Sequence, residues 1–290
     1  MSEPGPRLID AFAQTVGRRA WIPRRIRSFL VRSIVGQERQ EPGFHFDVDL
    51  YGHRYNGHTN SHIDWYVYYF GGYDILGSSL LRSLARRLSP TVVLDVGANS
   101  GTHTIAVQEY SEQIHCFEPY EPVRNSLAKN IHSNGLTNVV IHPFGLSDRN
   151  AQLPFHPGRS GNQGTGSFAD DTDQAIRLPV RIGDEVIQEG GFGEVDLIKI
   201  DVEGHECQVL RGLESTLNQT RPIVMWELHA VSSTTECLQR LPPNYETLEI
   251  RPRSRWSRTT ARLIRSDGGT RANLLSVPSE RLSCIGEFVS

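Results

Sequence analysis

The sequence predicts a doubly wound α/β fold, in which a mostly parallel sheet carries helices on both faces. Two observations support this prediction. Short, almost continuously apolar segments recur along the chain, and amphipathic segments of helical spacing separate them. Strands that are buried on both faces have such apolar sequences, and helices normally connect neighbouring parallel strands. A chain of 290 residues is long enough to bury a full core.

The elements follow one another in a regular order. Five strands are predicted at TVVLDVG, QIHCFEP, NVVIHPF, VDLIKID and RPIVMWEL, and YETLEI and NLLSVP are predicted to close the sheet. Residues 102–110 are predicted to form the helix after the first strand. Other helices are recognised by apolar residues at helical spacing: Leu76, Leu80, Leu81, Leu84 and Leu88 before the first strand, Val123, Leu127 and Ile131 after the second, and Val209, Leu210, Leu213 and Leu217 after the fourth.

Two segments interrupt this order, and one precedes it. We predict a single domain over residues 46–290 with a hairpin insertion at about 151–182, and an arginine-rich, irregular insertion at 251–265 whose role the sequence does not indicate. Residues 1–45 form a basic amphipathic extension, in which one helical face carries Ile26, Phe29, Leu30 and Ser33. Such a helix either contacts an anionic membrane surface, here through residues 18–35, or packs on the domain or on a second subunit as a homo-oligomer.

Composition excludes some classes of protein. The net charge of −3 argues against binding of nucleic acid, which usually requires a basic excess. No apolar stretch approaches the roughly 20 residues that span a bilayer. The four cysteines lie far apart, and Cys116 and Cys207 fall within predicted elements, which favours free thiols in a reducing compartment. We therefore expect a cytoplasmic protein, peripheral to the membrane if the extension binds lipid.

The turn after the first strand, VVLDVGANSG, predicts a nucleotide-type cofactor. Gly97 and Gly101 allow a close backbone approach, and Asp95 and Glu118 lie at strand ends, where open α/β sheets bind ligands and an acidic group can hold ribose hydroxyls. A dinucleotide loop requires glycine where Asn99 stands. S-adenosylmethionine, which has no pyrophosphate, fits better. A nicotinamide-dependent oxidoreductase and a glycine turn that serves packing alone are the alternatives.

The stretch LIKIDVEGHE places titratable groups at the end of the fourth strand. Lys199 and Lys129 are the only lysines among 30 lysine and arginine residues, and Lys199 faces the same side as Asp201. A buried lysine is costly unless it is paired with carboxylates. We expect Lys199 to form an ion pair that fixes the strand ends, to orient a carboxylate toward cofactor or substrate, or both.

Together these segments resemble the FkbM-type methyltransferases. The resemblance rests on GGYD, VLDVGANSG, FEPYEPVRNSLAKNIHSNGL, GLSD, VRIGDEVI, DLIKIDVEGHE and VMWEL, and covers about residues 60–278. It implies a class I methyltransferase (Rossmann-like) sheet of seven strands with the last strand antiparallel, in which the first five have the order 3-2-1-4-5, and S-adenosylmethionine-dependent O-methylation. The cofactor-binding residues that follow are Asp95, Gly97, Asn99, Gly101, Glu118, Leu146 of GLSD near the adenine, and Asp201.

The catalytic residues are less defined. Methyl transfer is an in-line displacement that depends on alignment, and an alcohol acceptor must also lose its proton. Lys199, Asp201, His205 and His229 are the catalytic candidates, with either histidine as the base. Asp201, Glu203, Glu227 and His229 also have the donor types of a divalent metal site, which we do not favour. The acceptor stays open between a sugar, polyketide or peptide hydroxyl and a carboxylate, and a non-catalytic, membrane-associated adaptor is the third alternative.

Overall fold

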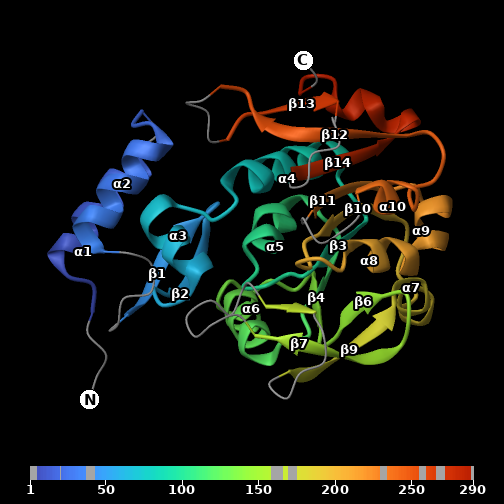
Figure 1. Ribbon diagram of the computed structural model, residues 1–290, viewed down its shortest axis with the longest axis horizontal. Helices are drawn as coiled ribbons and strands as arrows, with labels where there is room; N and C mark the ends of the chain where they lie inside the picture. Colours follow the sequence, from blue (N-terminus) through green and yellow to red (C-terminus); the bar gives the residue numbers. More distant parts are fainter. Residues whose placement is uncertain are drawn as a thin grey trace.

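A computed structural model describes residues 5–19, 21–36, 43–157, 166–168, 175–228, 234–254, 259–265 and 272–288. Its centre is an eight-stranded sheet with the order β13-β12-β14-β11-β10-β3-β4-β5 (Figure 1). The strands are β3 (Val92–Val96), β4 (Gln113–Phe117), β5 (Val139–His142), β10 (Val195–Ile200), β11 (Ile223–Leu228), β12 (Tyr245–Pro252), β13 (Ala261–Arg265) and β14 (Ala272–Pro278). The first five predicted strands are parallel neighbours in the predicted order, and β14 is antiparallel to β11. The predicted doubly wound fold is confirmed.

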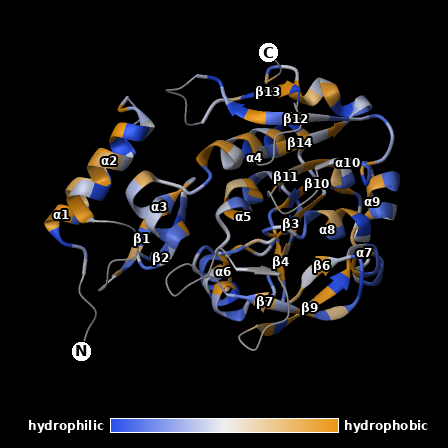
Figure 2. Cartoon of the chain, in the orientation of Figure 1, coloured by the Kyte–Doolittle hydropathy of each residue, from blue (hydrophilic) through white to orange (hydrophobic). Residues whose placement is uncertain are grey.

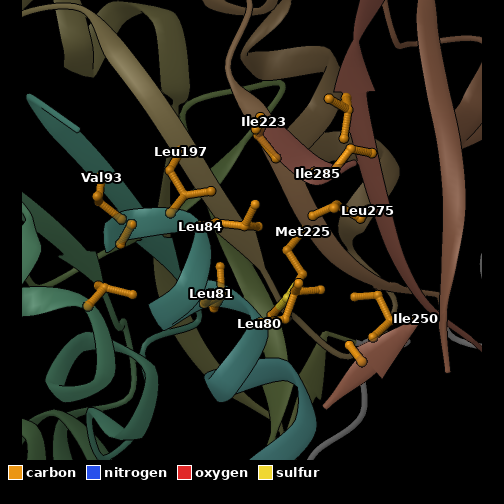
Figure 3. Packing of buried hydrophobic residues seen from close by; sticks show 14 of the residues in the cluster. Leu80, Leu81, Leu84, Val93, Leu197, Ile223, Met225, Ile250, Leu275 and Ile285 are labelled. Carbon is orange, nitrogen blue, oxygen red and sulfur yellow. The ribbon is translucent and has the colours of Figure 1, made fainter. Parts of the chain in front are cut away.

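Helices cover both faces of this sheet. One face carries α4 (Ile75–Leu88), α5 (Thr102–Val107) and α6 (Glu121–Ser133), and the other carries α7 (Gly183–Gly190), α8 (Glu206–Gly212), α9 (Glu214–Gln219) and α10 (Thr234–Leu238). Alternate residues of a strand point to opposite faces, so Val93 packs with Leu84 in one core cluster, whereas Val92 and Leu94 belong to the other. Figure 3 shows the first cluster between α4 and the sheet. Along the chain, apolar segments alternate with polar ones (Figure 2).

The edge strand β13 corrects one expectation. The sequence predicts an irregular insertion at 251–265, but residues 261–265 add an eighth strand beside β12. Ala261 and Leu263 are buried, while Arg262 is exposed and Ile264 is half-buried. A half-buried strand shows this alternation. The high arginine content made the segment resemble an irregular loop in the sequence. Residues 255–258 of this insertion lie outside the described part.

Residues 145–182 contribute a second, smaller sheet. It has the order β6-β9-β7-β8, with β6 (Gly145–Ser147), β7 (Ala151–His156), β8 (Ser167–Phe168) and β9 (Ile176–Ile182). The segment predicted as a hairpin insertion forms the antiparallel β7–β9 pair, and β6 pairs with β9 in parallel.

The N-terminal elements pack together beside α5. They are α1 (Leu8–Arg18), α2 (Arg24–Val35), β1 (His45–Leu50), β2 (His53–His58) and α3 (His62–Phe70). The 3₁₀ helix η1 (Gln108–Tyr110) follows α5. A third core cluster joins Ala13 and Val31 to Tyr55, Trp65 and Ile105. Because this cluster crosses residue 45, the division into an extension and a domain stays a prediction. The chain closes with η3 (Ser279–Ile285).

Helix α2 does not bury the apolar face that the sequence indicates. Ile26 and Phe29 are 51% and 69% exposed, whereas Arg27 is 2% exposed and Val31 is fully buried. The Nη1 atom of Arg27 donates hydrogen bonds to the carbonyl oxygens of Gly17 and Arg19, at 3.3 and 3.2 Å. The side chain of Arg27 therefore packs inward, where backbone oxygens accept its hydrogen bonds, and Ile26 and Phe29 stay exposed to solvent.

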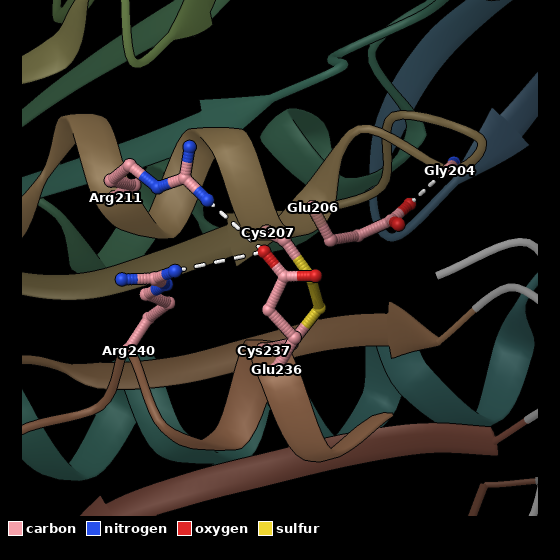
Figure 4. Close-up of a disulfide and its surroundings, with 7 residues drawn as sticks. All are labelled: Gly204, Glu206, Cys207, Arg211, Glu236, Cys237 and Arg240. Carbon is pink, nitrogen blue, oxygen red and sulfur yellow. Dashed lines mark hydrogen bonds and ion pairs between the residues drawn. A yellow bond between two sulfur atoms is a disulfide. The ribbon is translucent and has the colours of Figure 1, made fainter. Parts of the chain in front are cut away.

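The prediction of free thiols is wrong for two cysteines. Cys207 of α8 and Cys237 of α10 form a disulfide (Figure 4), while Cys116 and Cys284 are free. Since β10 and β11 are adjacent parallel strands, the helices that follow them begin side by side, and a sequence separation of 30 residues conceals this in the sequence. The cysteine argument for a reducing compartment therefore no longer holds, and a cytoplasmic location stays a prediction. No helix within the described ranges is long and apolar enough to cross a membrane.

Candidate functional site

The turn between β3 and α5 has a backbone that requires its glycines. Gly97 has a φ of +75°, and a Cβ there would overlap the carbonyl oxygen of Asp201 at the end of β10. Gly101 has a φ of +91° and begins α5. Asn99 between them also adopts the left-handed region, with a φ of 51°, which asparagine tolerates better than most residues. The loop therefore lies directly against the end of the fourth strand.

Glu118 lies at the end of β4, against this loop. Its Oε2 accepts the backbone N–H of Asn99 at 3.1 Å, and its Oε1 accepts that of Tyr120 at 3.0 Å. The side chain is 8% exposed, and burial raises its pKa to about 7, although both backbone N–H groups act in the opposite direction. Each carboxylate oxygen can accept a second hydrogen bond. The two adjacent hydroxyls of an adenosine ribose are therefore suitable donors.

This pKa leads to a prediction about cofactor affinity. Ribose hydroxyls need the ionised carboxylate, and Glu118 loses its charge as the pH falls through about 7. The affinity for S-adenosylhomocysteine should therefore be highest above pH 7, and should fall by up to about tenfold between pH 8 and pH 6. Calorimetric titration at pH 6, 7 and 8 measures this dependence. Glu118→Gln should bind weakly and with little change over this range; an equally steep profile in that variant would assign the dependence to another group.

Lys199 joins the ends of β10 and β3. Its Nζ donates a hydrogen bond to the carbonyl oxygen of Gly97 at 2.7 Å, and lies 3.3 Å from Oδ1 of Asp95 and 3.8 Å from Oδ2 of Asp201. Burial would lower the pKa of this lysine, but the two carboxylates outweigh it and raise the pKa. Asp95 is 2% exposed and accepts a second bond from Thr104 at 2.6 Å. The expected ion pair is present, and it fixes the backbone of the glycine loop.

A cavity of about 460 Å³ opens at the carboxyl ends of β10 and β11. Its polar lining includes Tyr73, Asp74, His103, Lys199, Asp201 and Glu227. Tyr66, Phe70 and Trp226 add aromatic surface. Burial raises the pKa of the Tyr73 hydroxyl, and the negative charges of Asp201, Glu227 and Glu203 raise it further. The cavity therefore has an acidic wall with apolar rings beside it.

Of the predicted site residues that the structure describes, Lys199 and Asp201 line this cavity, whereas Asp95, Gly97, Asn99, Gly101, Glu118, Leu146 and His205 do not. The Nε2 atom of His205 hydrogen-bonds to Oγ of Ser147 at 2.9 Å, and burial lowers the pKa of this imidazole to about 4. Leu146 is 1% exposed and packs in the core, so only its backbone could contact an adenine. His229 lies outside the described residues, and its role stays a prediction.

The described members of the possible metal-ligand set are not placed to bind a metal ion. Within the described ranges, no three His, Cys, Asp or Glu side chains are placed to hold a metal ion, and this includes Asp201, Glu203 and Glu227. His229, the fourth member of that set, is not among these residues.

The match to a family model is the observation that decides the family. The Methyltransferase FkbM domain matches residues 95–253, which contain the glycine turn, Glu118, and the strand with Lys199 and Asp201. The chain belongs to the FkbM methyltransferase family.

Several named methyltransferases are similar to this FkbM chain. Hexuronic acid methyltransferase AglP of Haloferax volcanii is 29% identical over 139 residues, which are 48% of this chain and 56% of AglP. The 2-O-methyltransferase NoeI of Sinorhizobium fredii is 27% identical over 193 residues, 59% of this chain and 78% of NoeI. The chain thus spans little more than half the length of AglP.

Two solved methyltransferase structures match this chain at low similarity. Methyltransferase FkbM from Methylobacillus flagellatus has a TM-score of 0.42 and 16% identity, over 65% of this chain and 43% of that one. The O-methyltransferase TomG from Streptomyces achromogenes, in complex with SAM, has a TM-score of 0.41 and 12% identity, over 70% of this chain and 79% of TomG.

Sequence reasoning about this FkbM chain missed two residues of the cavity. His103 stands two positions after Gly101, next to the glycine turn, and the sequence predicts no role for it. Asp74 belongs to the GGYD motif, which carried the resemblance but received no role. The available signal was that Asp74 lies within one motif of the family resemblance and His103 lies next to another.

Proposed function

We propose that this chain is an S-adenosylmethionine-dependent O-methyltransferase that acts on a hydroxyl group of a neutral, carbohydrate-like acceptor. The observation that carries the proposal is the contact of Glu118 with the left-handed loop, whose Gly97 carbonyl accepts a hydrogen bond from Lys199 on the wall of an acidic, aromatic cavity. Family membership and the names of AglP and NoeI support methyl transfer to a carbohydrate-like acceptor, although the hexuronic acid in the name of AglP is an acidic sugar.

The residues of the loop fit the cofactor. Glu118 offers two acceptor positions to the ribose, the loop at Gly97 brings backbone close to the end of β10, and Asp201 offers a negative charge to a sulfonium. When bound, S-adenosylmethionine supplies an electrophilic methyl group. Asn99 occupies the position where a dinucleotide loop requires glycine, which disfavours the nicotinamide alternative.

The charges of the cavity favour a neutral acceptor over a carboxylate. Three carboxylates line it, Asp74, Asp201 and Glu227, against two cations, Lys199 and Arg27, so negative charge is in excess. An anionic acceptor would be repelled. Carboxylate oxygens accept hydrogen bonds from hydroxyls, and aromatic rings cover the apolar faces of a sugar. A neutral polyhydroxylated molecule therefore suits this wall.

The test is transfer of a tritiated methyl group from S-adenosylmethionine to a panel of neutral monosaccharides and uronic acids. We expect label on a neutral sugar as a base-stable ether. Label that appears only as a base-labile ester of a uronic acid would reject the neutral acceptor, and absence of transfer to every member of the panel would reject the proposed activity on sugars.

We further propose that α2 contacts an anionic lipid surface. The exposed side chains of Trp21, Ile26 and Phe29 lie beside exposed Arg19 and Arg25, and this combination suits the boundary between acyl chains and anionic headgroups. We expect Ile26→Ser with Phe29→Ser to reduce cosedimentation with vesicles of phosphatidylserine and phosphatidylcholine at least fivefold. Thr15→Ser on α1 serves as the control.

Other outcomes separate the alternatives for this helix. Equal sedimentation of the double variant and the wild type would reject lipid contact by this face. A change from dimer to monomer in light scattering would assign the face to a second copy of the chain. The non-catalytic adaptor predicts lipid binding together with no methyl transfer.

A further inference from the structure

His103 and Asp74 come from different elements and meet at the cavity wall. His103 lies in the first turn of α5, directly after the glycine loop, and Asp74 is the N-cap of α4. Oδ1 of Asp74 accepts the backbone N–H of Gly77 at 3.0 Å. Its Oδ2 lies 3.5 Å from Nε2 of His103. Both side chains line the cavity together with Lys199 and Asp201, so they face the region where cofactor and acceptor are proposed to meet.

The contact with Asp74 determines which ring nitrogen of His103 can act. The Nε2 atom is buried and forms no hydrogen bond within the described residues, and the Asp74 carboxylate lies 3.5 Å from it, at ion-pair distance. A proton on Nε2 is stabilised by that carboxylate, which leaves Nδ1 with a lone pair. Burial would raise the pKa of Asp74, but His103, the Gly77 N–H and Lys199 outweigh burial and lower it. Asp74 is therefore ionised at neutral pH and can orient the ring.

Charged and polar groups from several elements line the cavity with this ring. Asp74 lies 3.5 Å from it, and Asp201 and Glu227 stand on the same cavity wall. Tyr73 and His62 also line the cavity, together with two cations: Lys199, which is paired with Asp95 and Asp201, and Arg27, whose Nη1 atom bonds to backbone oxygens.

We propose that His103 is the general base of the methyl transfer and that Asp74 is its positioning residue; this inference rests on the proposed function. The acceptor hydroxyl gives its proton to Nδ1 of His103. The oxygen's electron pair forms the bond to the methyl carbon, and the electron pair of the broken carbon–sulfur bond leaves with sulfur. The proton then passes from the ring to solvent. His205, with its Nε2 bonded to Ser147, is not needed in this scheme.

The pair can be tested without cofactor or acceptor. The ¹⁵N chemical shifts of the neutral imidazole distinguish its two tautomers, and we expect His103 to carry its proton on Nε2 in the wild type. Asp74→Ser should remove this preference, because serine still caps α4 but is too short to reach the ring. A wild-type ring protonated on Nδ1 would overturn the proposal, since no lone pair would then face the acceptor.

The catalytic role is tested with the neutral sugar that receives label in the transfer assay. His103→Ala should lower kcat by about 100- to 10,000-fold, with S-adenosylhomocysteine affinity within threefold of wild type. Added imidazole should restore part of the rate, which it would not do for a structural role. Asp74→Ser should lower kcat less. His132→Ala, an exposed histidine of α6, is the control.

Two kinds of result would contradict the proposal. If His103→Ala keeps its kcat, or loses S-adenosylhomocysteine affinity tenfold at unchanged kcat, the pair holds the cofactor instead and the proposal is wrong. If the wild type binds S-adenosylhomocysteine but labels no sugar, the proposed acceptor class fails first, and the role of His103 as a base for sugar hydroxyls fails with it.

Discussion

Replacing Lys199 with methionine is expected to lower the free energy of unfolding by about 3–5 kcal/mol. Lys199 and Asp95 are 4% and 2% exposed, and their charged atoms lie 3.3 Å apart. Methionine fills a similar volume but leaves Asp95 as a buried charge without its cation, which is the expensive way to break a buried ion pair. The Gly97 carbonyl also loses its donor. Urea denaturation followed by circular dichroism measures the change.

A double variant separates the charge from the packing. Lys199→Met combined with Asp95→Asn removes both charges and keeps an oxygen that can accept the Thr104 hydroxyl. We expect the double variant to be more stable than the sum of the two single changes predicts, by about 0.5–3 kcal/mol. Strict additivity, or a loss below about 1 kcal/mol in Lys199→Met, would mean that the pair contributes little to stability.

Gly97→Ala should abolish most cofactor binding. The new Cβ would overlap the carbonyl oxygen of Asp201, and the φ of +75° is unfavourable for alanine. The left-handed conformation costs about 1–2 kcal/mol, and overpacking adds about 1–3 kcal/mol. Because the loop must move away from β10, we expect S-adenosylhomocysteine affinity to fall at least 100-fold in a calorimetric titration.

Gly135→Ala is the matched control. Gly135 follows α6 with a φ of +61°, and a Cβ there would meet no atom within 4 Å. This change carries the conformational cost without the overlap, so stability should fall by about 1–2 kcal/mol while cofactor affinity stays unchanged. Equal affinity in Gly97→Ala and Gly135→Ala would show that the loop at Gly97 does not contact the cofactor.

The sequence predicted those parts of the molecule that follow from strand order. Once five parallel strands are recognised, the end of β10 must lie beside the end of β3, and a lone buried lysine there must find carboxylates. The pairing of Lys199 with Asp95 and Asp201 was predictable for this reason. The site at the carboxyl edge of the sheet follows from the same geometry.

Contacts between helices were not predictable. Asp74 and His103 belong to different helices, and nothing in their spacing indicates that α4 and α5 bring them to 3.5 Å. The Cys207–Cys237 disulfide depends likewise on how α8 and α10 pack. His205 was chosen for its place after β10, but its side chain turns toward Ser147. The position of a residue along the chain therefore predicts at which edge of the sheet it lies, but not the direction in which its side chain points.

The central claim is that the β3–α5 loop and Glu118 bind the adenosyl part of S-adenosylmethionine. Titration calorimetry of the full chain with S-adenosylhomocysteine and, separately, with NADH tests it most directly. We predict that S-adenosylhomocysteine binds at one site per chain, that NADH does not bind, and that Glu118→Ala weakens the binding at least tenfold, since hydrogen bonds to a charged group contribute about 1.5–3 kcal/mol. Binding of NADH in place of S-adenosylhomocysteine, or an unchanged affinity in Glu118→Ala, would contradict the account.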